Sequence, residues 1–354
     1  MHQEELSGPK VGLFSAYVPR ELLYALGCTP LRVFPSAGKP TAAEAFLPRN
    51  FCSLDRLILA TFLEDDNQDL DAVIFADEDD AARRLHDVWS SAVSLPVWGF
   101  VEVPRAANLL AVDRYAGVLA RLATELEAHA GRPLSSRSLR QAITIYNEQR
   151  RLLADLKQHW LAGRVNTLLY RRLRQSALTQ DPLTANQRLV SALQSLDGQP
   201  PEPFFPTRLL LLAELAAPAG LVRLVEAHGA QVVAEDSDLD ERELAEMLPS
   251  DAGTVAELLT ILAQAYLSKP PGPRMRDLPR RLGYLSNLVA ERGVVAAICA
   301  YNKFCDLYLA EYPTLAAHLE GLGIPVLLLE LEDETVGGQH RTRIEAFLEM
   351  LREG

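Results

Sequence analysis

Short apolar runs that alternate with helix-like segments constrain the fold of this 354-residue chain more than any other feature. In the first part of the chain, four strand-like runs read VGLFSA from Val11, LRVF from Leu31, LDAVIFAD from Leu70 and LPVWGFVEV from Leu95. Runs of this kind, apolar on both faces, are typical of buried parallel strands. The segments PRELLYALG, CSLDRLILATFLED and DAARRLHDVW between them have helical spacing. Strands and helices that alternate across short connections predict a doubly wound parallel sheet.

The rest of the chain divides into a helical stretch and a second alternating region. From about residue 108 to residue 197 the strand signal disappears, and four prolines in GQPPEPFFP, from Gly198, then predict a linker. Strand-like runs resume with TRLLLLAEL, AQVVAED, VVAAICAYN and PVLLLELED. We therefore expect an α/β protein with two doubly wound parallel-sheet lobes, residues 1–107 and 206–354, joined by a helical segment, residues 108–205. Because ligands bind outside the carboxyl ends of parallel strands, we expect the site in a cleft between the lobes.

The charge of the chain narrows the classes of partner. A formal net charge of −12 argues against a nucleic acid or an anionic membrane as a partner. No apolar run approaches the roughly 20 residues that span a bilayer, and MHQEELSGPK lacks the features of a secretory signal. We expect a cytoplasmic protein, so its scattered cysteines, without a CxxC pair, are expected to be free thiols or metal ligands.

Several common motifs are absent from the sequence. The seven histidines show no HxxxH, HxH or His–Cys spacing, so no zinc site is indicated by spacing. The sequence also contains no GxGxxG, GxxxxGK[ST] or GxSxG motif. Dinucleotide binding in the usual manner, ATP hydrolysis by this chain and a serine-hydrolase elbow are therefore not expected.

Three stretches together resemble the 2-hydroxyacyl-CoA dehydratase / benzoyl-CoA reductase family. The first is GLFSAYVPRELLYALGCTPLRV, and the second is IFADEDDAARRLHDVW. The third and most specific is KFCDLYLAEYPTLAAHLEGLGIPVLLLELEDETVGGQHRTRIEAFLEML, which is similar to a family ending. The resemblance covers nearly the whole chain and is weakest in the helical middle.

This resemblance implies an iron-sulfur enzyme complex. Members of the family hold a [4Fe-4S] cluster through three cysteines per subunit, and two homologous subunits pair as a heterodimer. An ATP-dependent activator protein supplies an electron, and a ketyl-type radical forms on an acyl-CoA thioester. Thiolate ligands suit such a cluster because they are soft and tune the potential of iron.

Carried over residue by residue, the resemblance places two of the three cluster cysteines on Cys52 and Cys305. The remaining family cysteine falls on Asp79, a harder and weaker ligand for iron, so the cluster is expected to be altered, labile or absent. Further departures lie in VVAEDSDLDERELAEM, where members carry Asp-Thr-Cys-Thr-Gly, and in SKPPGPRMRD, where a Pro-Cys pair is frequent. Outside the family context, Cys52 and Cys305 fit small buried core residues, and Asp79 fits a helix cap in a solvated acidic loop.

Other residues are candidates for substrate contacts. Ser15 follows the first strand, where relatives place a small polar group or a thiol, although a loop serine explains it equally well. Arg56 lies one helical turn after Cys52 and could bind an anion, or form a surface ion pair. A strand end that faces a helix start makes an anion site, which adds Glu330 at a strand end and Gln339, Arg341 and Thr342 at the start of the last helix. Cys28 and Cys299 are expected to be core residues.

Two functions remain open at this level. The chain is either a cluster-bearing subunit of an acyl-CoA dehydratase or aryl-CoA reductase, with Ser15 and Glu330 in catalytic roles, or a non-catalytic, cluster-poor partner that scaffolds a catalytic homologue. The acyl group of the substrate cannot be read from the sequence.

Overall fold

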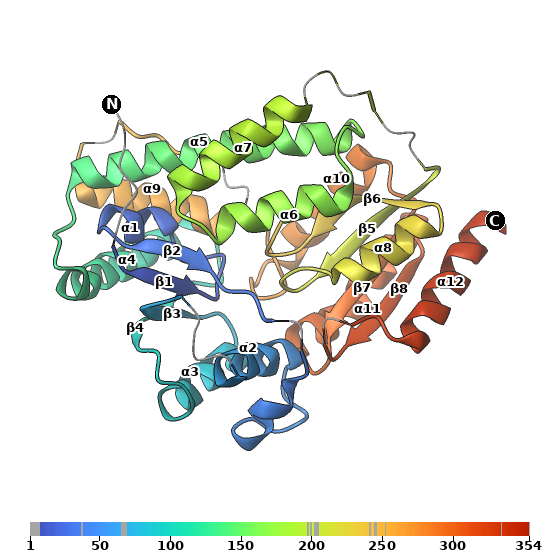
Figure 1. Ribbon diagram of the computed structural model, residues 1–354, viewed down its shortest axis with the longest axis horizontal. Helices are drawn as coiled ribbons and strands as arrows, with labels where there is room; N and C mark the ends of the chain where they lie inside the picture. The colour runs from blue at the N-terminus through green and yellow to red at the C-terminus, as the bar shows by residue number, and fades with distance from the viewer. Residues whose placement is uncertain are drawn as a thin grey trace.

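Two parallel sheets form the framework of the protein. The computed structural model describes residues 8–36, 38–64, 69–196, 198, 200–201, 205–240, 242–243, 246–251, 253–333 and 335–353. The first sheet has the order β2-β1-β3-β4 and the second the order β6-β5-β7-β8, with every pair parallel. This arrangement confirms the predicted pair of parallel-sheet lobes (Figure 1). The strands are β1 (Lys10–Leu13), β2 (Thr29–Arg32), β3 (Ala72–Asp77), β4 (Val97–Glu102), β5 (Thr207–Ala213), β6 (Ala230–Asp236), β7 (Ala296–Asn302) and β8 (Val326–Leu331).

Helices cover both faces of each sheet and connect the two. Caps fix their ends; for example, the Asn108 side chain accepts a hydrogen bond from Ala111 N at the start of α4, and Gly131 ends this helix in the left-handed conformation. Figure 1 shows α5 running along both sheets, as expected for a helical connector. The described helices are the 3-10 helix η1 (Pro40–Ala45) and α1 (Arg20–Ala25), α2 (Ser53–Glu64), α3 (Asp80–Ala92), α4 (Leu109–Ala130), α5 (Ser136–Leu161), α6 (Thr167–Leu178), α7 (Pro182–Leu196), α8 (Ala219–Ala227), α9 (Val255–Leu267), α10 (Leu278–Arg292), α11 (Asp306–Gly321) and α12 (Gly338–Glu353).

In the described part of the chain the apolar core forms three clusters, and one of them belongs to both lobes. Successive strand residues point to opposite faces, so Leu209 and Leu211 join the outer cluster of the second lobe. Leu210 and Leu212 instead join a cluster that also contains Val73 and Phe75 of the first sheet. This shared cluster, which includes residues of α2, α3, α10 and α11, joins the two lobes through an apolar interior.

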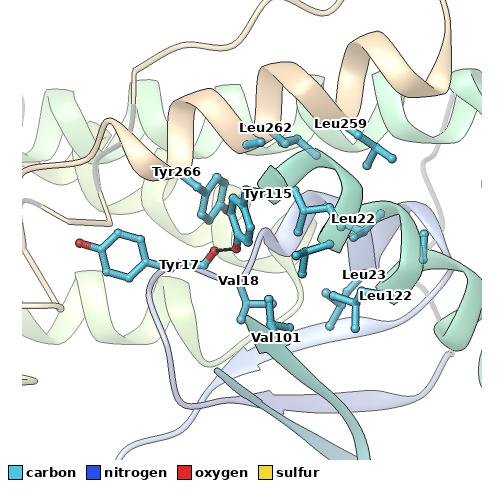
Figure 2. Close-up of a cluster of buried hydrophobic side chains, with 14 of the residues drawn as sticks. Tyr17, Val18, Leu22, Leu23, Val101, Tyr115, Leu122, Leu259, Leu262 and Tyr266 are labelled. Atoms are coloured by element: carbon cyan, nitrogen blue, oxygen red, sulfur yellow. Dashed lines mark hydrogen bonds between the residues drawn. The ribbon is translucent and has the colours of Figure 1, made fainter. Parts of the chain in front are cut away.

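Helix α9 packs with the first lobe, although it lies in the second half of the sequence. Its residues Leu259, Leu262 and Tyr266 are buried in the same cluster as Leu22 of α1 and Leu122 of α4 (Figure 2). The first lobe is therefore stabilised by the apolar side chains of a helix that follows the linker in sequence.

A buried lysine close to α9 gives the protein a pH-dependent stability term. Lys269 Nζ donates a hydrogen bond to Ala16 O at 2.6 Å and lies 3.9 Å from the centroid of the Tyr266 ring. Burial lowers the pKa of Lys269 to about 8, so keeping its charge below that pH costs on the order of 3 kcal/mol. Between about pH 8 and the ordinary lysine pKa, Lys269 is protonated in the unfolded chain but largely neutral in the folded protein. The free energy of unfolding therefore increases as the pH rises through this range.

The Lys269→Met variant is expected to gain stability relative to the native protein at pH 7, and to lose this advantage as the pH rises toward 10. Denaturant titrations of both proteins at several pH values measure this difference. The comparison isolates Lys269 because the tyrosines and cysteines titrate in both proteins. A stability difference that stays constant over this range would show that Lys269 has an ordinary pKa.

Candidate functional site

The carboxyl ends of the central strands bring polar residues of both lobes into one crevice. Ser15 follows β1, Glu78 and Asp79 follow β3, Glu214 follows β5, and Cys305 follows β7. The strand order reverses between β1 and β3 in the first sheet and between β5 and β7 in the second. Open parallel sheets bind ligands at such switch points. The two switch points meet at the crevice: Arg274, from the segment before α10, forms ion pairs with Asp79 of the first and Glu214 of the second.

The first turn of α2 docks against the second lobe and carries Cys52 with it. Ser53 N donates to Lys303 O at 2.9 Å, and Ser53 Oγ donates to Leu331 O at 2.9 Å. On the other side, Phe304 adopts a φ of 61° after β7, and Cys305 occupies the N-cap position of α11 without a side-chain capping hydrogen bond. The two cysteines are therefore held by backbone and side-chain contacts between the lobes.

The thiols of Cys52 and Cys305 meet beside the carboxylate of Glu214. The two sulfurs and a Glu214 oxygen lie within 4.8 Å of one another, and all three residues are buried. The hydrogen bond to Cys305, together with burial, raises the pKa of Cys52 well above its ordinary value. The hydrogen bond with Cys52 acts in the opposite direction on Cys305, but burial and the nearby Glu214 outweigh it and raise the pKa of Cys305 to about 11. Both groups are neutral thiols at pH 7 in the metal-free protein.

Arg274 is the central cation of the crevice. Its Nε lies 2.8 Å from Asp79 Oδ2 and 3.4 Å from Glu78 Oε2, and Nη2 binds Glu214 Oε1. The guanidinium carbon also lies 5.5 Å from the centroid of the Tyr308 ring. One arginine therefore pairs with carboxylates that follow strands of both sheets.

The Asp79 carboxylate is fully engaged by protein groups. Its Oδ1 accepts a hydrogen bond from Ala82 N at 2.8 Å, which caps α3, and its Oδ2 is bound by Arg274. Burial would raise the pKa of Asp79, but the charge of Arg274 and the hydrogen bond from Ala82 outweigh this effect and lower it. Asp79 is thus an ionised helix cap and ion-pair partner.

Ser15 lies beside Glu78 at the same end of the first sheet. Ser15 Oγ donates a hydrogen bond to Glu78 Oε1 and accepts one from Tyr17 N at 2.9 Å. Burial raises the pKa of Glu78 to about 8, although Arg274 opposes the shift. These residues line a narrow pocket of ≈ 40 Å³ together with Arg274 and Asp238.

The remaining predicted site residues lie elsewhere. Arg56 is buried on α2, where Nη1 donates to Arg49 O at 2.8 Å and Nη2 lies 3.5 Å from Glu44 Oε1, so the guanidinium binds the loop before its own helix. The other four are exposed at the strand β8 and helix α12 corner and do not line the crevice described above; they are Glu330, Gln339, Arg341 and Thr342. Their roles in substrate binding remain predictions.

Two cavities open at the mouth of the crevice. The first, of ≈ 440 Å³, is lined by Cys52, Cys305 and Asp79, together with Arg83 and Arg105. The second, of ≈ 510 Å³, shares these two arginines and adds Arg114, Arg276, Asp77 and Glu102. The thiols therefore border a space that continues into an arginine-lined cavity.

Among the residues that the structure describes, no helix combines the length and the apolar character that crossing a membrane requires.

Sequence reasoning missed the two residues that organise the crevice, Arg274 and Glu214. Glu214 had a usable signal, because it is a carboxylate directly after the apolar strand run TRLLLLA, at the sheet edge where ligands bind. Arg274 lies in an irregular segment between α9 and α10, and its proximity to Asp79, 195 residues away in sequence, depends on the tertiary fold.

These donors do not fit a [4Fe-4S] cluster held by three cysteines. The family resemblance places the remaining cysteine at Asp79, whose Oδ1 is bound by Ala82 N and whose Oδ2 is bound by Arg274. The two thiols that are present contact each other, whereas a cluster binds each cysteine sulfur to a different iron atom. Iron binding by Asp79 Oδ2 would also compete with the ion pair between Asp79 and Arg274.

Comparisons with known proteins point to one family. A family model described as "2-hydroxyglutaryl-CoA dehydratase, D-component" matches residues 15–351. The (R)-phenyllactyl-CoA dehydratase beta subunit of Clostridium sporogenes is 24% identical, over 99% of this chain and 94% of its own length. The beta subunit of lactoyl-CoA dehydratase from Anaerotignum propionicum is 25% identical over the same shares, 99% and 94%. One of the subunits of benzoyl-CoA reductase from Thauera aromatica is 23% identical over 90% of this chain and 84% of its own length.

Proposed function

Because this chain belongs to the 2-hydroxyglutaryl-CoA dehydratase D-component family, we propose that it is the cluster-poor partner subunit of a heteromeric acyl-CoA dehydratase or aryl-CoA reductase complex. The observation that carries this proposal is the position of Arg274, whose guanidinium pairs with Glu78, Asp79 and Glu214 in the crevice. Removing a buried cation from its carboxylate partners costs several kcal/mol, so we expect Arg274 to stay paired with these carboxylates in the crevice.

In such a complex, single-electron chemistry on the CoA thioester belongs to a homologous catalytic subunit, and the electron comes from an ATP-dependent activator protein. This chain contributes a fold that pairs with its homologue, and a surface that helps to hold the substrate. Four arginines, Arg83, Arg105, Arg114 and Arg276, line the ≈ 510 Å³ cavity against two carboxylates, Asp77 and Glu102, with which Arg83 and Arg114 pair. This excess of positive charge supports a role in binding the phosphate groups of coenzyme A. The arginines lie on a protein whose net charge of −12 would otherwise repel a polyanion.

The cluster-bearing alternative keeps one specific argument in its favour. Cys52 and Cys305 come from different lobes and still meet at the mouth of the crevice, as the family resemblance implies for two of the three cluster ligands. In this alternative the cluster would have to take its third ligand from a group other than Asp79, because that carboxylate is already bound.

Iron and sulfide analysis distinguishes these two functions. The full chain, expressed anaerobically with the genes that neighbour its own, is expected to copurify with a homologous subunit that carries three cysteines. After anaerobic reconstitution with iron and sulfide, this chain alone is expected to lack acid-labile sulfide and the broad visible absorption of a cluster.

The proposal fails if the isolated chain binds iron and sulfide in cluster stoichiometry and loses both on Cys305→Ala. It also fails if the chain purifies as an active homodimer that needs no homologous partner. The Cys28→Ala variant serves as a matched control for the loss of a buried thiol outside the crevice.

A further inference from the structure

Cys52, Glu214 and Cys305 form a group of potential metal ligands that the cluster-poor role leaves unexplained. Their donor atoms lie within 4.8 Å of one another, and they come from the start of α2, the end of β5 and the start of α11. A tetrahedral zinc ion with Zn–S bonds of about 2.3 Å keeps its ligand atoms roughly 3.3 to 3.8 Å apart. The three donors therefore need to move by only about an ångström to bind a single ion.

Glu214 has an oxygen available for such an ion. Its side chain is 1% exposed, Oε1 is bound by Arg274, and the carboxylate accepts a hydrogen bond from the thiol of Cys305. Oε2 has no nitrogen or oxygen donor in the described part of the chain. A buried carboxylate oxygen without such a donor is costly, which calls for a ligand or a proton at this place. A carboxylate that binds a metal through one oxygen while a neighbouring side chain holds the other is typical of protein metal sites.

We propose that Cys52, Cys305 and Glu214 bind a single thiophilic divalent cation of the zinc type. Two thiolates favour zinc over magnesium, calcium or manganese, which prefer oxygen ligands alone. Three protein ligands leave the fourth tetrahedral position for water or a substrate atom, as in catalytic zinc sites. This open position faces the ≈ 440 Å³ cavity, which is lined by both cysteines.

The surrounding charges suit this ion. Two thiolates and one carboxylate exceed the charge of a divalent cation by one negative unit, and the guanidinium of Arg274, which is paired with both Glu214 and Asp79, offsets part of the combined negative charge. The arginine that pairs with Asp79 therefore also stabilises the negative charge of a site for a single ion. The inference goes beyond the proposed function, because it holds whether or not the chain pairs with a homologue.

The test uses the purified full chain, stripped of metal under anaerobic conditions and then titrated with Zn²⁺ and separately with Co²⁺. We expect one ion per chain by elemental analysis, and a cobalt spectrum with thiolate-to-metal charge-transfer bands. Cys52→Ser and Cys305→Ser are each expected to weaken binding at least tenfold and to reduce these bands. Glu214→Gln, which keeps a hydrogen-bond acceptor for Arg274, is expected to weaken binding while leaving the bands in place.

The control is the Cys28→Ser variant, which removes a buried thiol from the apolar core of the first lobe. This variant is expected to bind metal as the native chain does. The cobalt spectrum of the native chain tests the site even if a variant fails to fold. Absence of a bound ion, a cobalt spectrum without thiolate bands, or unchanged binding in both cysteine variants would overturn the metal site while leaving the partner role standing. Iron bound with acid-labile sulfide at the same cysteines would overturn both proposals.

Discussion

Arg274→Ala is expected to destabilise the protein by about 3 to 5 kcal/mol near pH 8, because it leaves buried carboxylates without their cation. Arg274 pairs with Asp79 at 2.8 Å and with Glu78 at 3.4 Å, and it also binds Glu214. Without the guanidinium, the pKa values of these groups rise, and they fold in the protonated form. The loss of stability should therefore shrink as the pH falls toward 5, where protonation of the carboxyl groups costs little. Denaturant titrations at the two pH values measure the effect.

Arg83→Ala is the matched control for this loss. Arg83 also binds a carboxylate of the first lobe, with its Nη2 2.6 Å from Asp77 Oδ2, but its side chain is 53% exposed. An exposed pair contributes little to stability, because solvent screens it. Equal losses in the two variants, or a loss on Arg274→Ala that does not depend on pH, would show that the crevice carboxylates do not depend on Arg274.

The sheet architecture was predictable because it depends on local patterns. Buried parallel strands carry apolar residues on both faces, and the runs from Val11 and Leu70 became the neighbouring strands β1 and β3. Helix α9 shows the limit of such patterns. Its apolar face marks it as a packed helix, but no local signal says that Leu262 packs in the first lobe rather than the second.

The site was predictable where residues follow strands, and unpredictable where it depends on long-range ion pairs. The meeting of Cys52 and Cys305 was expected from the family resemblance, and the crevice from the carboxyl ends of the strands. The engagement of Asp79 by Arg274 could not be read from the sequence, because an acidic residue before a helix looks the same whether it binds solvent, a metal or a distant arginine. The ligand group containing Glu214 also joins three distant segments, so no spacing motif could reveal it.

A fragment of residues 1–205, which contains the first lobe and the helical segment, is expected not to fold cooperatively on its own, because it lacks α9. The α9 side chains of Leu258, Leu259, Leu262 and Tyr266 are all buried in the cluster of the first lobe. Burial of such side chains contributes about 1.5 to 3 kcal/mol each, so their sum approaches the 5 to 15 kcal/mol stability of a whole domain. Thermal unfolding followed by circular dichroism is expected to show a broad transition without a cooperative midpoint.

Fusion of residues 253–269 to this fragment through a flexible linker is expected to restore part of the cooperativity, because the linker lets α9 cover its own face of the first lobe, whereas the face that packs on the second lobe stays exposed. Leu262→Asp in the fused helix should abolish the rescue, since it buries an unpaired carboxylate in the cluster. Thr260→Asp, on the exposed side of the same helix, should leave the rescue intact. Cooperative unfolding of the unfused fragment would mean that the first lobe closes its own core, and that α9 only covers a surface that is already stable.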